Sequence, residues 1–234
     1  MTLAALIDDL VCANHILYNE GVVDGFGHIS ARHPELPERF LLSRSIAPAI
    51  VTHDDIMEFD FEGNPVDARG RRPYLERFIH SEIYRTRPQV QAIVHSHSPS
   101  VIPFGVTGVG LRPVYHLSGF LGGGAPIFEI RDVAGPETDM LIRTPGLGAA
   151  LALALGTAPY ALMRGHGSVA VGASVKQVVY RAIYAEVNAR LQSEASRMGE
   201  ITFLSEAEAA NAAATNDQVV DRPWELWKKR VSGR

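Results

Sequence analysis

The segment from Thr144 to Met163 carries no charged side chain, and this absence constrains the fold more than any other feature of the sequence. Its length is close to the roughly 20 residues that a membrane-spanning helix needs. Pro145 and Gly156, however, predict a short buried helix that begins at the proline and ends at the glycine. Residues 158–163 then predict a buried strand. The segment therefore predicts a soluble protein that makes no contact with a membrane.

The other predicted helices and strands follow one another without a regular strand–helix–strand rhythm. Apolar spacing predicts helices at residues 3–20, about 74–85, 174–198 and 221–227. Ser205 and Glu208 form a capping box that begins a further helix. Strands are predicted at residues 40–42, 57–61, 90–95 and 127–130. Because no internal repeat or low-complexity linker interrupts the chain, residues 1–234 are predicted to form one α/β domain with a mixed sheet covered by helices.

Composition excludes several classes of protein. The chain has 22 Lys and Arg against 26 Asp and Glu, a net charge of −4, with no basic run, so a nucleic-acid partner is not expected. Cys12 is the only cysteine, which excludes an intrachain disulfide and a thiolate zinc cluster. The first residues after Met1 lack the features of a signal peptide, so a cytoplasmic protein is expected.

The run Ile93-Val94-His95-Ser96-His97 is the sharpest chemical feature of the sequence. Residues two apart on a strand point to the same face, so His95 and His97 can converge on one point. Two imidazoles on one rigid face are half of a metal site. The alternative is that both are ordinary polar residues at the end of a strand.

Two further sequence elements could contribute to the same site as His95 and His97. His166 lies between Gly165 and Gly167, and glycines allow backbone and ligand to approach closely. A third imidazole would complete a His₃ site with open positions, although an exposed histidine in a turn has the same pattern. Glu76 is expected in the first turn of its helix, where the helix dipole favours an anion; a surface ion pair is the alternative.

The order of these motifs resembles the class II aldolase/adducin family, typified by fuculose-phosphate aldolase and ribulose-phosphate 4-epimerase. The resemblance runs from the first helix to the long helix after His166. The matching motifs are Gly27-His28-Ile29-Ser30, Leu42-Ser43, the Pro73–Glu76 element, His95-Ser96-His97 and Gly165-His166-Gly167. Several ordered motifs together are more specific than any one of them.

The resemblance implies a three-layer α/β/α sandwich with a mixed central sheet. It assigns His95, His97 and His166 to one divalent metal ion per subunit and Glu76 to acid/base work beside that metal. Zinc or manganese is favoured, with cobalt or iron as alternatives, because His₃ with a carboxylate suits all four. The resemblance also implies a homotetramer with active sites between subunits.

The sequence departs from sugar-phosphate members of the family around the expected phosphate site. Tyr74 and Leu75 replace small hydroxyl residues before the glutamate, His28 replaces an asparagine, and Arg44 replaces a glycine after Ser43. These changes remove a phosphate cradle, and a guanidinium at Arg44 can grip a planar carboxylate. The alternative for Arg44 is an ordinary surface cation. His28, Ser43, Arg44 and Tyr74 are therefore the predicted substrate-binding residues.

These departures resemble the branch of the family that decarboxylates hydroxylated aromatic dicarboxylates, such as 3-hydroxy-2-methylpyridine-4,5-dicarboxylate in vitamin B6 degradation or 3,4-dihydroxyphthalate. The implied enzyme is a metal-dependent carboxy-lyase that releases CO₂ from the carboxylate ortho to the ring hydroxyl, without an organic cofactor. The alternatives are an aldolase or epimerase of a sugar phosphate and a non-catalytic module like the head domain of adducin.

Other residues carry weaker signals. Gly122-Gly123-Gly124 lacks the Lys-Ser/Thr of a phosphate-binding loop and predicts a flexible loop. Tyr115 and His116 lie in a Pro/Gly-rich loop, and the sequence leaves their role open. Trp224 and Trp227 are expected to dock their helix on the core or on a neighbouring subunit.

Overall fold

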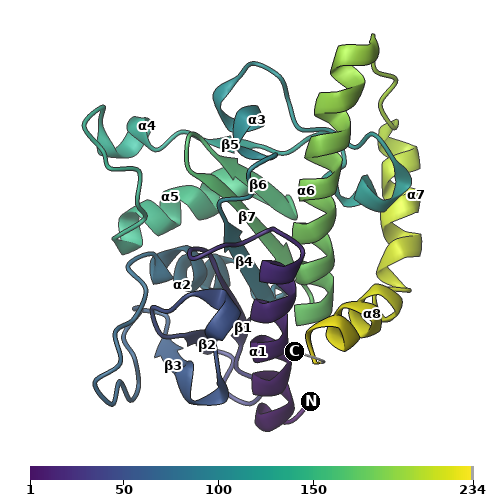
Figure 1. Cartoon of the computed structure of the whole chain (residues 1–234). Helices are drawn as coiled ribbons and strands as arrows, with labels where there is room; N and C mark the ends of the chain where they lie inside the picture. Colours follow the sequence, from purple (N-terminus) through teal and green to yellow (C-terminus); the bar gives the residue numbers. More distant parts are fainter. Residues whose placement is uncertain (233–234) are drawn as a thin grey trace.

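The computed structural model of the chain describes residues 1–232, and within them seven strands form one mixed sheet in the order β3-β2-β1-β4-β7-β6-β5 (Figure 1). The strands are β1 (His28–Arg32), β2 (Arg39–Ser43), β3 (Ile56–Asp60), β4 (Ala92–Ser96), β5 (Ile127–Phe128), β6 (Tyr160–Met163) and β7 (Gly167–Gly172). The β5–β6 pair is parallel, and the other neighbouring strands are antiparallel.

Helices cover both faces of this sheet, which confirms the predicted α/β/α sandwich (Figure 1). One face packs against α1 (Leu3–Asn19), α6 (Val175–Met198) and α8 (Asp221–Val231), and the other against α2 (Arg77–Thr86) and α5 (Pro145–Leu155). The shorter elements are α3 (Ile102–Val106), α4 (Arg131–Ala134), α7 (Glu206–Asp217) and the 3₁₀ helices η1 (Pro48–Ile50), η2 (His53–Asp55) and η3 (His116–Leu121).

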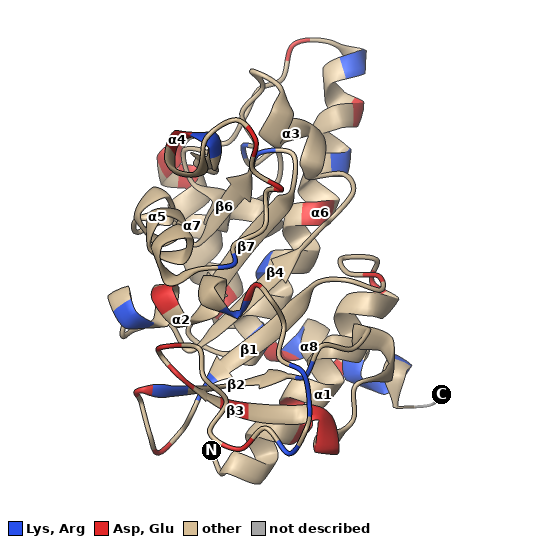
Figure 2. Cartoon of the chain, turned by 90° about the vertical axis from the view of Figure 1, so that its left-hand side faces the viewer, with Lys and Arg blue, Asp and Glu red and all other residues tan. Residues whose placement is uncertain are grey.

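Successive residues of β4 supply two different cores. Val94 packs in the core beneath α1 and α6, whereas Ile93 packs in the core beneath α2 and α5. His95 is two residues after Ile93 on the same strand, so its side chain points to the same face of the sheet, the face covered by α2. The strands β4, β6 and β7 carry no Lys, Arg, Asp or Glu, and Figure 2 shows the charged residues mainly in loops and on helices.

The charge-free segment folds as predicted. Thr144 caps α5 by accepting a hydrogen bond from Leu147 N–H, Pro145 is the first helical residue, and Gly156 ends the helix with φ of +54°. β6 follows after a short turn and is buried along its whole length. No helix within residues 1–232 is long and apolar enough to cross a bilayer.

Two strands and one helix boundary differ from the prediction. β1 and β7 were not expected, because glycine, serine and histidine weaken their apolar pattern. α2 begins at Arg77 instead of about Tyr74, so Glu76 is the residue that precedes the helix and not a residue of its first turn. The Tyr74 hydroxyl donates a hydrogen bond to the Ile46 carbonyl, and this contact ties Tyr74 to a segment outside the helix.

Gly148→Ala is expected to destabilise the fold by about 1–3 kcal/mol, the usual cost of overpacking. A Cβ on Gly148 would lie 2.3 Å from the Phe78 carbonyl oxygen and 2.9 Å from Glu82 Cγ, so α5 would have to move away from α2. Urea-induced unfolding measures the loss. Gly146→Ala, on the same helix, is the matched control, because its Cβ would meet only Thr144 Oγ1 at 4.0 Å. Equal effects of the two substitutions would contradict the close packing of α5 on α2.

Candidate metal centre and active site

Adjacent strands at the centre of the sheet and one inter-strand turn bring three histidines together. His95 lies near the end of β4, where it pairs in register with His28 of β1 and Val169 of β7. His97 follows directly after β4, and His166 lies in the turn between β6 and β7. The pairing of β4 with β7 therefore sets the separation of the three imidazoles.

The glycines on either side of His166 are required by the backbone. Gly165 has a φ of +64°, in the left-handed region that favours glycine. A Cβ on Gly167 would lie 2.1 Å from the Ser96 carbonyl oxygen. The backbone of β7 thus approaches the end of β4 more closely than a residue with a side chain allows, and this approach holds His166 beside His97.

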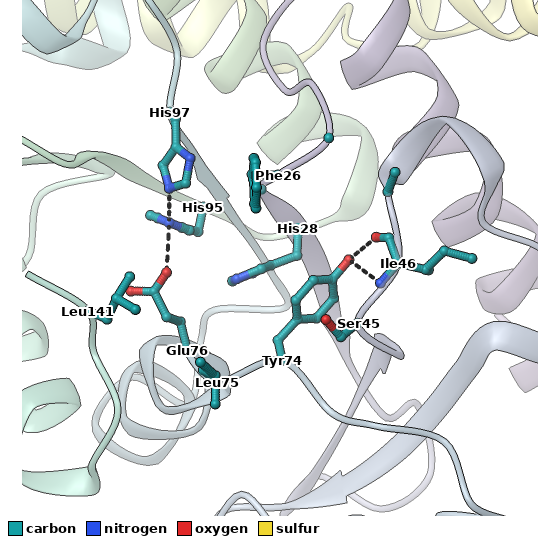
Figure 3. A pocket seen from close by; sticks show the side chains of 13 residues that line it. Phe26, His28, Ser45, Ile46, Tyr74, Leu75, Glu76, His95, His97 and Leu141 are labelled. Carbon is teal, nitrogen blue, oxygen red and sulfur yellow. Dashed lines mark hydrogen bonds and ion pairs between the residues drawn. The ribbon is translucent and has the colours of Figure 1, made fainter. Parts of the chain in front are cut away.

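Glu76 completes a cluster with the three histidines, and its ligand atom lies within 4.8 Å of theirs. His97 Nε2 lies 3.2 Å from His95 Nε2 and 3.0 Å from His166 Nε2. Glu76 Oε2 lies 3.6 Å from His95 Nε2 and 3.5 Å from His166 Nε2. Figure 3 shows Glu76, His95 and His97 facing one another. The structure thus brings together all four residues that the family resemblance assigned to the metal and its acid/base partner.

Backbone carbonyls fix the orientation of two of these imidazoles. His95 Nδ1 lies 3.0 Å from the Ser168 carbonyl oxygen, and His166 Nδ1 lies 2.9 Å from the Met140 carbonyl oxygen. A carbonyl can only accept, so each Nδ1 carries a hydrogen, and the neutral ring presents a lone pair on Nε2. Burial lowers the pKa of His95 to about 3 and also lowers the pKa of His97. The neutral form that binds metals is therefore the favoured one.

These donors fit a divalent cation. The lone pairs of His95 Nε2 and His166 Nε2 both face His97 Nε2, which has at most one hydrogen to share between them. Two nitrogens bound to one zinc at about 2.0–2.1 Å and a tetrahedral angle lie about 3.3 Å apart, close to the separations found here. Three imidazoles and one carboxylate suit zinc, manganese, cobalt or iron.

The two carboxylate oxygens of the buried Glu76 have different surroundings. Oε1 accepts a hydrogen bond from the Ile142 N–H at 2.9 Å, whereas Oε2 faces the histidines. Burial raises the pKa of Glu76, whereas the hydrogen bond from the Ile142 N–H favours the ionised carboxylate, and the net shift of the pKa is downward. Glu76 is therefore ionised at neutral pH, the form that a metal ligand or a proton acceptor requires.

A cavity of about 500 Å³ opens beside the cluster (Figure 3). Its wall is largely aromatic and apolar, and no Lys or Arg is among the described residues that form it. Phe26 and Leu75 are 69% and 57% exposed, so the cavity opens to the surface of the chain. The lining residues are Gly25, Phe26, Gly27, His28, Ser45, Ile46, Ala47, Tyr74, Leu75, Glu76, His95, His97 and Leu141.

Two of the four predicted substrate-binding residues line this cavity. His28 and Tyr74 do so, with their ring centroids 4.5 Å apart. Ser43 is fully buried at the end of β2 and does not reach the wall. Ser45, two residues further along the chain, does reach it.

The structure does not bring Arg44 to the cavity. Its Nε lies 2.5 Å from Asp55 Oδ1, an ion pair that helps to hold the pKa of Asp55 below its ordinary value against the opposing effect of burial. This pair favours a structural role for Arg44 over the predicted grip on a substrate carboxylate, because its partner lies within the protein. The sequence could not reveal this pair, since Asp55 is eleven residues away in a separate turn.

Several residues of the wall were missed by the sequence analysis. Phe26 lies between two glycines, and this aromatic residue in a Gly-rich turn was the available signal. Ser45, Ile46 and Leu141 carried no signal, because they reach the cavity only through the packing of separate loops.

The residues with weaker signals lie outside this cavity. His116 begins η3, its carbonyl accepts a hydrogen bond from Asn216, and Tyr115 precedes it beside Tyr184. Trp224 and Trp227 are buried in the core beneath α1 and α6, so they dock their own helix on that core. The 122–124 glycines lie after η3 in a turn.

Comparison with known proteins connects this geometry to named relatives. The model of the family described as "Class II Aldolase and Adducin N-terminal domain" matches residues 8–193. The chain is 40% identical over 240 residues to decarboxylase tropJ of Talaromyces stipitatus, covering 93% of this chain and 90% of that protein. It is 31% identical over 214 residues to a 3,4-dihydroxyphthalate decarboxylase of Arthrobacter keyseri, covering 85% of this chain and 82% of that protein.

A solved structure shows the same architecture. L-fuculose 1-phosphate aldolase from Glaciozyma antarctica superposes with a TM-score of 0.81 at 26% sequence identity, covering 98% of this chain and 89% of that chain. The helices and the mixed sheet that position the cluster are thus shared with an aldolase, whereas the two sequence relatives named above are decarboxylases.

Proposed function

Because the chain belongs to the class II aldolase and adducin family and is an enzyme of the lyase class, we propose that it is a metal-dependent decarboxylase of a hydroxylated aromatic carboxylate. One observation carries the choice of substrate class. The cavity beside the His₃–Glu cluster is walled by aromatic and apolar side chains and, among the described residues, by no Lys or Arg. A flat aromatic ring fits such a wall, which among the described residues offers no Arg or Lys of the kind that commonly binds a phosphate group.

The metal site of the proposal consists of His95, His97 and His166, with Glu76 beside it. One divalent ion held there would act as a Lewis acid that draws negative charge from the substrate hydroxyl and carboxylate oxygens. We propose zinc or manganese, because both suit three imidazoles and a carboxylate. Tyr74, whose hydroxyl is bound to the Ile46 backbone, offers its ring face as a wall for the aromatic substrate.

Glu76 is the proton carrier of the proposed reaction. Its carboxylate accepts the proton of the ring hydroxyl next to the leaving carboxylate and passes that proton to the ring carbon that bears this carboxylate, giving a β-keto acid. The bond from the ring carbon to the carboxylate then breaks. CO₂ leaves, and the electron pair returns to the oxygen as the ring becomes aromatic again. A solvent proton restores the hydroxyl, so the net change replaces the carboxylate by hydrogen and releases CO₂.

The deciding experiment measures CO₂ release from 3,4-dihydroxyphthalate by the zinc- or manganese-loaded protein. The expected product is 3,4-dihydroxybenzoate, and chelation of the metal should stop the reaction. Phthalate, which lacks the hydroxyl groups, is the matched substrate and should release no CO₂. Cleavage of L-fuculose 1-phosphate without CO₂ release from any hydroxyaryl or hydroxypyridine dicarboxylate would instead identify a sugar-phosphate aldolase.

The proposal includes a homotetramer of one-domain subunits with active sites at the subunit interfaces. The exposed Phe26 and Leu75 at the mouth of the cavity support it, because apolar side chains beside a site are suited to burial by a neighbouring subunit. Light scattering measures the assembly. A fully active monomer would exclude sites completed by a neighbour.

Arg44→Ala is expected to lower kcat/KM for 3,4-dihydroxyphthalate by less than about 10-fold, which is below the loss of a buried charge-assisted hydrogen bond. The reason is that Arg44 pairs with Asp55 and does not line the cavity. Asp55→Ala removes the same ion pair from its other end and should have a similar effect. A loss of about 100-fold for Arg44→Ala alone would show that Arg44 binds the substrate after all.

A further inference from the structure

A chain of hydrogen-bonding side chains runs from inside the fold to the wall of the cavity. Tyr84 Oη lies 2.8 Å from Ser30 Oγ, Ser30 Oγ lies 2.6 Å from His80 Nδ1, and His80 Nε2 lies 2.7 Å from His28 Nδ1. The first three residues are fully buried and do not line the cavity, whereas His28 does. None of these four residues was assigned to the metal centre. This hydrogen-bond network is therefore separate from the metal centre but reaches the same cavity.

Secondary structure aligns the four side chains. His28 and Ser30 are two residues apart on β1 and therefore point to the same face of the sheet. His80 and Tyr84 are four residues apart on α2 and therefore lie on one side of that helix. The two pairs interleave where α2 packs on β1, which gives the order Tyr84, Ser30, His80, His28.

The hydrogen bonds of this chain have one favoured direction. Ser30 and the neutral His80 ring each supply one hydrogen, and within residues 1–232 these hydrogens have no acceptor outside the three links, so the links all point the same way. If Tyr84 donates to Ser30, then Ser30 donates to His80 Nδ1, and His80 Nε2–H donates to His28 Nδ1. In the opposite direction the Tyr84 hydroxyl hydrogen has no acceptor within residues 1–232, and a buried donor without a partner is strongly disfavoured.

The protonation states of the inner residues agree with this direction. Burial lowers the pKa of His80 to about 3, so its ring is neutral and has one donor and one acceptor nitrogen. Burial raises the pKa of Tyr84, which keeps the phenol hydrogen in place.

We infer that Tyr84, Ser30 and His80 are positioning residues that hold His28 as the tautomer with hydrogen on Nε2, and that His28 is thereby a fixed hydrogen-bond donor to a carboxylate oxygen of the substrate. His28 Nδ1 is occupied by His80, and Nε2 has no protein partner within residues 1–232. In Figure 3 the His28 ring lies between Tyr74 and His95, with centroid distances of 4.5 and 5.1 Å. Only the identity of the acceptor rests on the proposed function.

A fixed donor gives this part of the cavity a chemical preference. It pairs with a carboxylate, phenolate or carbonyl oxygen and disfavours an ammonium or amide N–H, which would face it donor to donor. The cavity thereby gains a group for a negatively charged oxygen although no Lys or Arg is among the described residues of its wall.

The direct test locates the ring hydrogen of His28 and requires no turnover, so it succeeds or fails independently of the decarboxylase proposal. In zinc-loaded protein containing ¹⁵N-labelled histidine, NMR should show a hydrogen on His28 Nε2 and none on Nδ1. His28→Gln assigns the signals by removing them. A hydrogen on His28 Nδ1 would overturn the inference.

Ser30→Ala tests the positioning role, because it removes the link that sets the orientation of His80. The hydrogen of His28 should then partition between both ring nitrogens. The dissociation constant of 3,4-dihydroxybenzoate, used as a probe, should rise about 2-fold or more, since only part of the molecules present the donor. Ser118→Ala is the matched control; Ser118 is also fully buried and hydrogen-bonded, but it contacts Asn188 and does not line the cavity.

A double-mutant cycle separates positioning from a general structural role. The amide of His28→Gln can donate a hydrogen bond to the probe whichever way the hydrogen bonds between Tyr84 and His80 point. In this background Ser30→Ala should leave the dissociation constant of the probe unchanged. If Ser30→Ala weakens binding equally in both backgrounds, its effect is structural and the positioning role is wrong.

Discussion

Replacing His97 by alanine is expected to lower the affinity for a divalent metal by at least about 100-fold and to reduce turnover in parallel. His97 Nε2 lies within 3.2 Å of the other two imidazole nitrogens, so the substitution removes the centre of the donor set. Loss of a group that only orients a metal ligand already costs about 10- to 100-fold in affinity, and loss of a ligand costs more. Because His97 is half-buried and follows β4, the sheet itself should form normally.

Zinc titration and metal analysis after dialysis measure this effect, alongside the rate of CO₂ release. His116→Ala is the matched control, since His116 lies outside the cavity at the start of η3. It should bind one zinc ion per chain with unchanged affinity. Wild-type zinc affinity in His97→Ala would exclude His97 from the metal site.

Glu76→Gln is expected to lower kcat by about 100-fold or more while changing the KM far less. The glutamine amide keeps the shape of the side chain, and its oxygen can still accept the Ile142 N–H, but it cannot carry a proton. Rapid-mixing assays under saturating metal separate this loss from a loss of the ion.

Glu82→Gln is the control for Glu76→Gln. Glu82 is also buried, lies on α2 and pairs with Arg85 at 3.4 Å, but it does not line the cavity. Its substitution should leave kcat within about 3-fold, because an exposed pairing partner contributes little. A near-normal kcat in fully metal-loaded Glu76→Gln would exclude Glu76 as the proton carrier.

The parts of the site that could be predicted from the sequence are those set by local geometry. Two histidines at strand spacing face the same way whatever else the chain does, and glycines around His166 indicate a close backbone approach. The motif order added Glu76, although its position before α2 and not within the first turn became visible only in the structure. The α/β class was predictable for a similar reason, because Pro145 and Gly156 divide the charge-free segment into a helix and a strand, whereas the three-layer sandwich followed from the family resemblance.

The parts that could not be predicted depend on contacts between distant segments. Arg44 matched a motif position, but its partner Asp55 decides where its side chain goes. The hydrogen-bond network from Tyr84 to His28 requires α2 to pack on β1, and the apolar pattern did not reveal that strand. The backbone carbonyls of Met140 and Ser168 have no sequence signature, since every residue carries one.

The central position of the cluster has a thermodynamic consequence. His95 is on β4, which is paired along its length with both β1 and β7, so the site cannot open locally without breaking the middle of the sheet. An ion bound only by the folded chain therefore adds its binding free energy to the stability of the whole sheet, about 2.7 kcal/mol at a free concentration 100 times the dissociation constant. The melting temperature should thus rise with metal concentration, and amide hydrogens of β1, β4 and β7 should gain protection together. The ion would then serve as a folding ligand of the whole chain as well as a reagent of its active site.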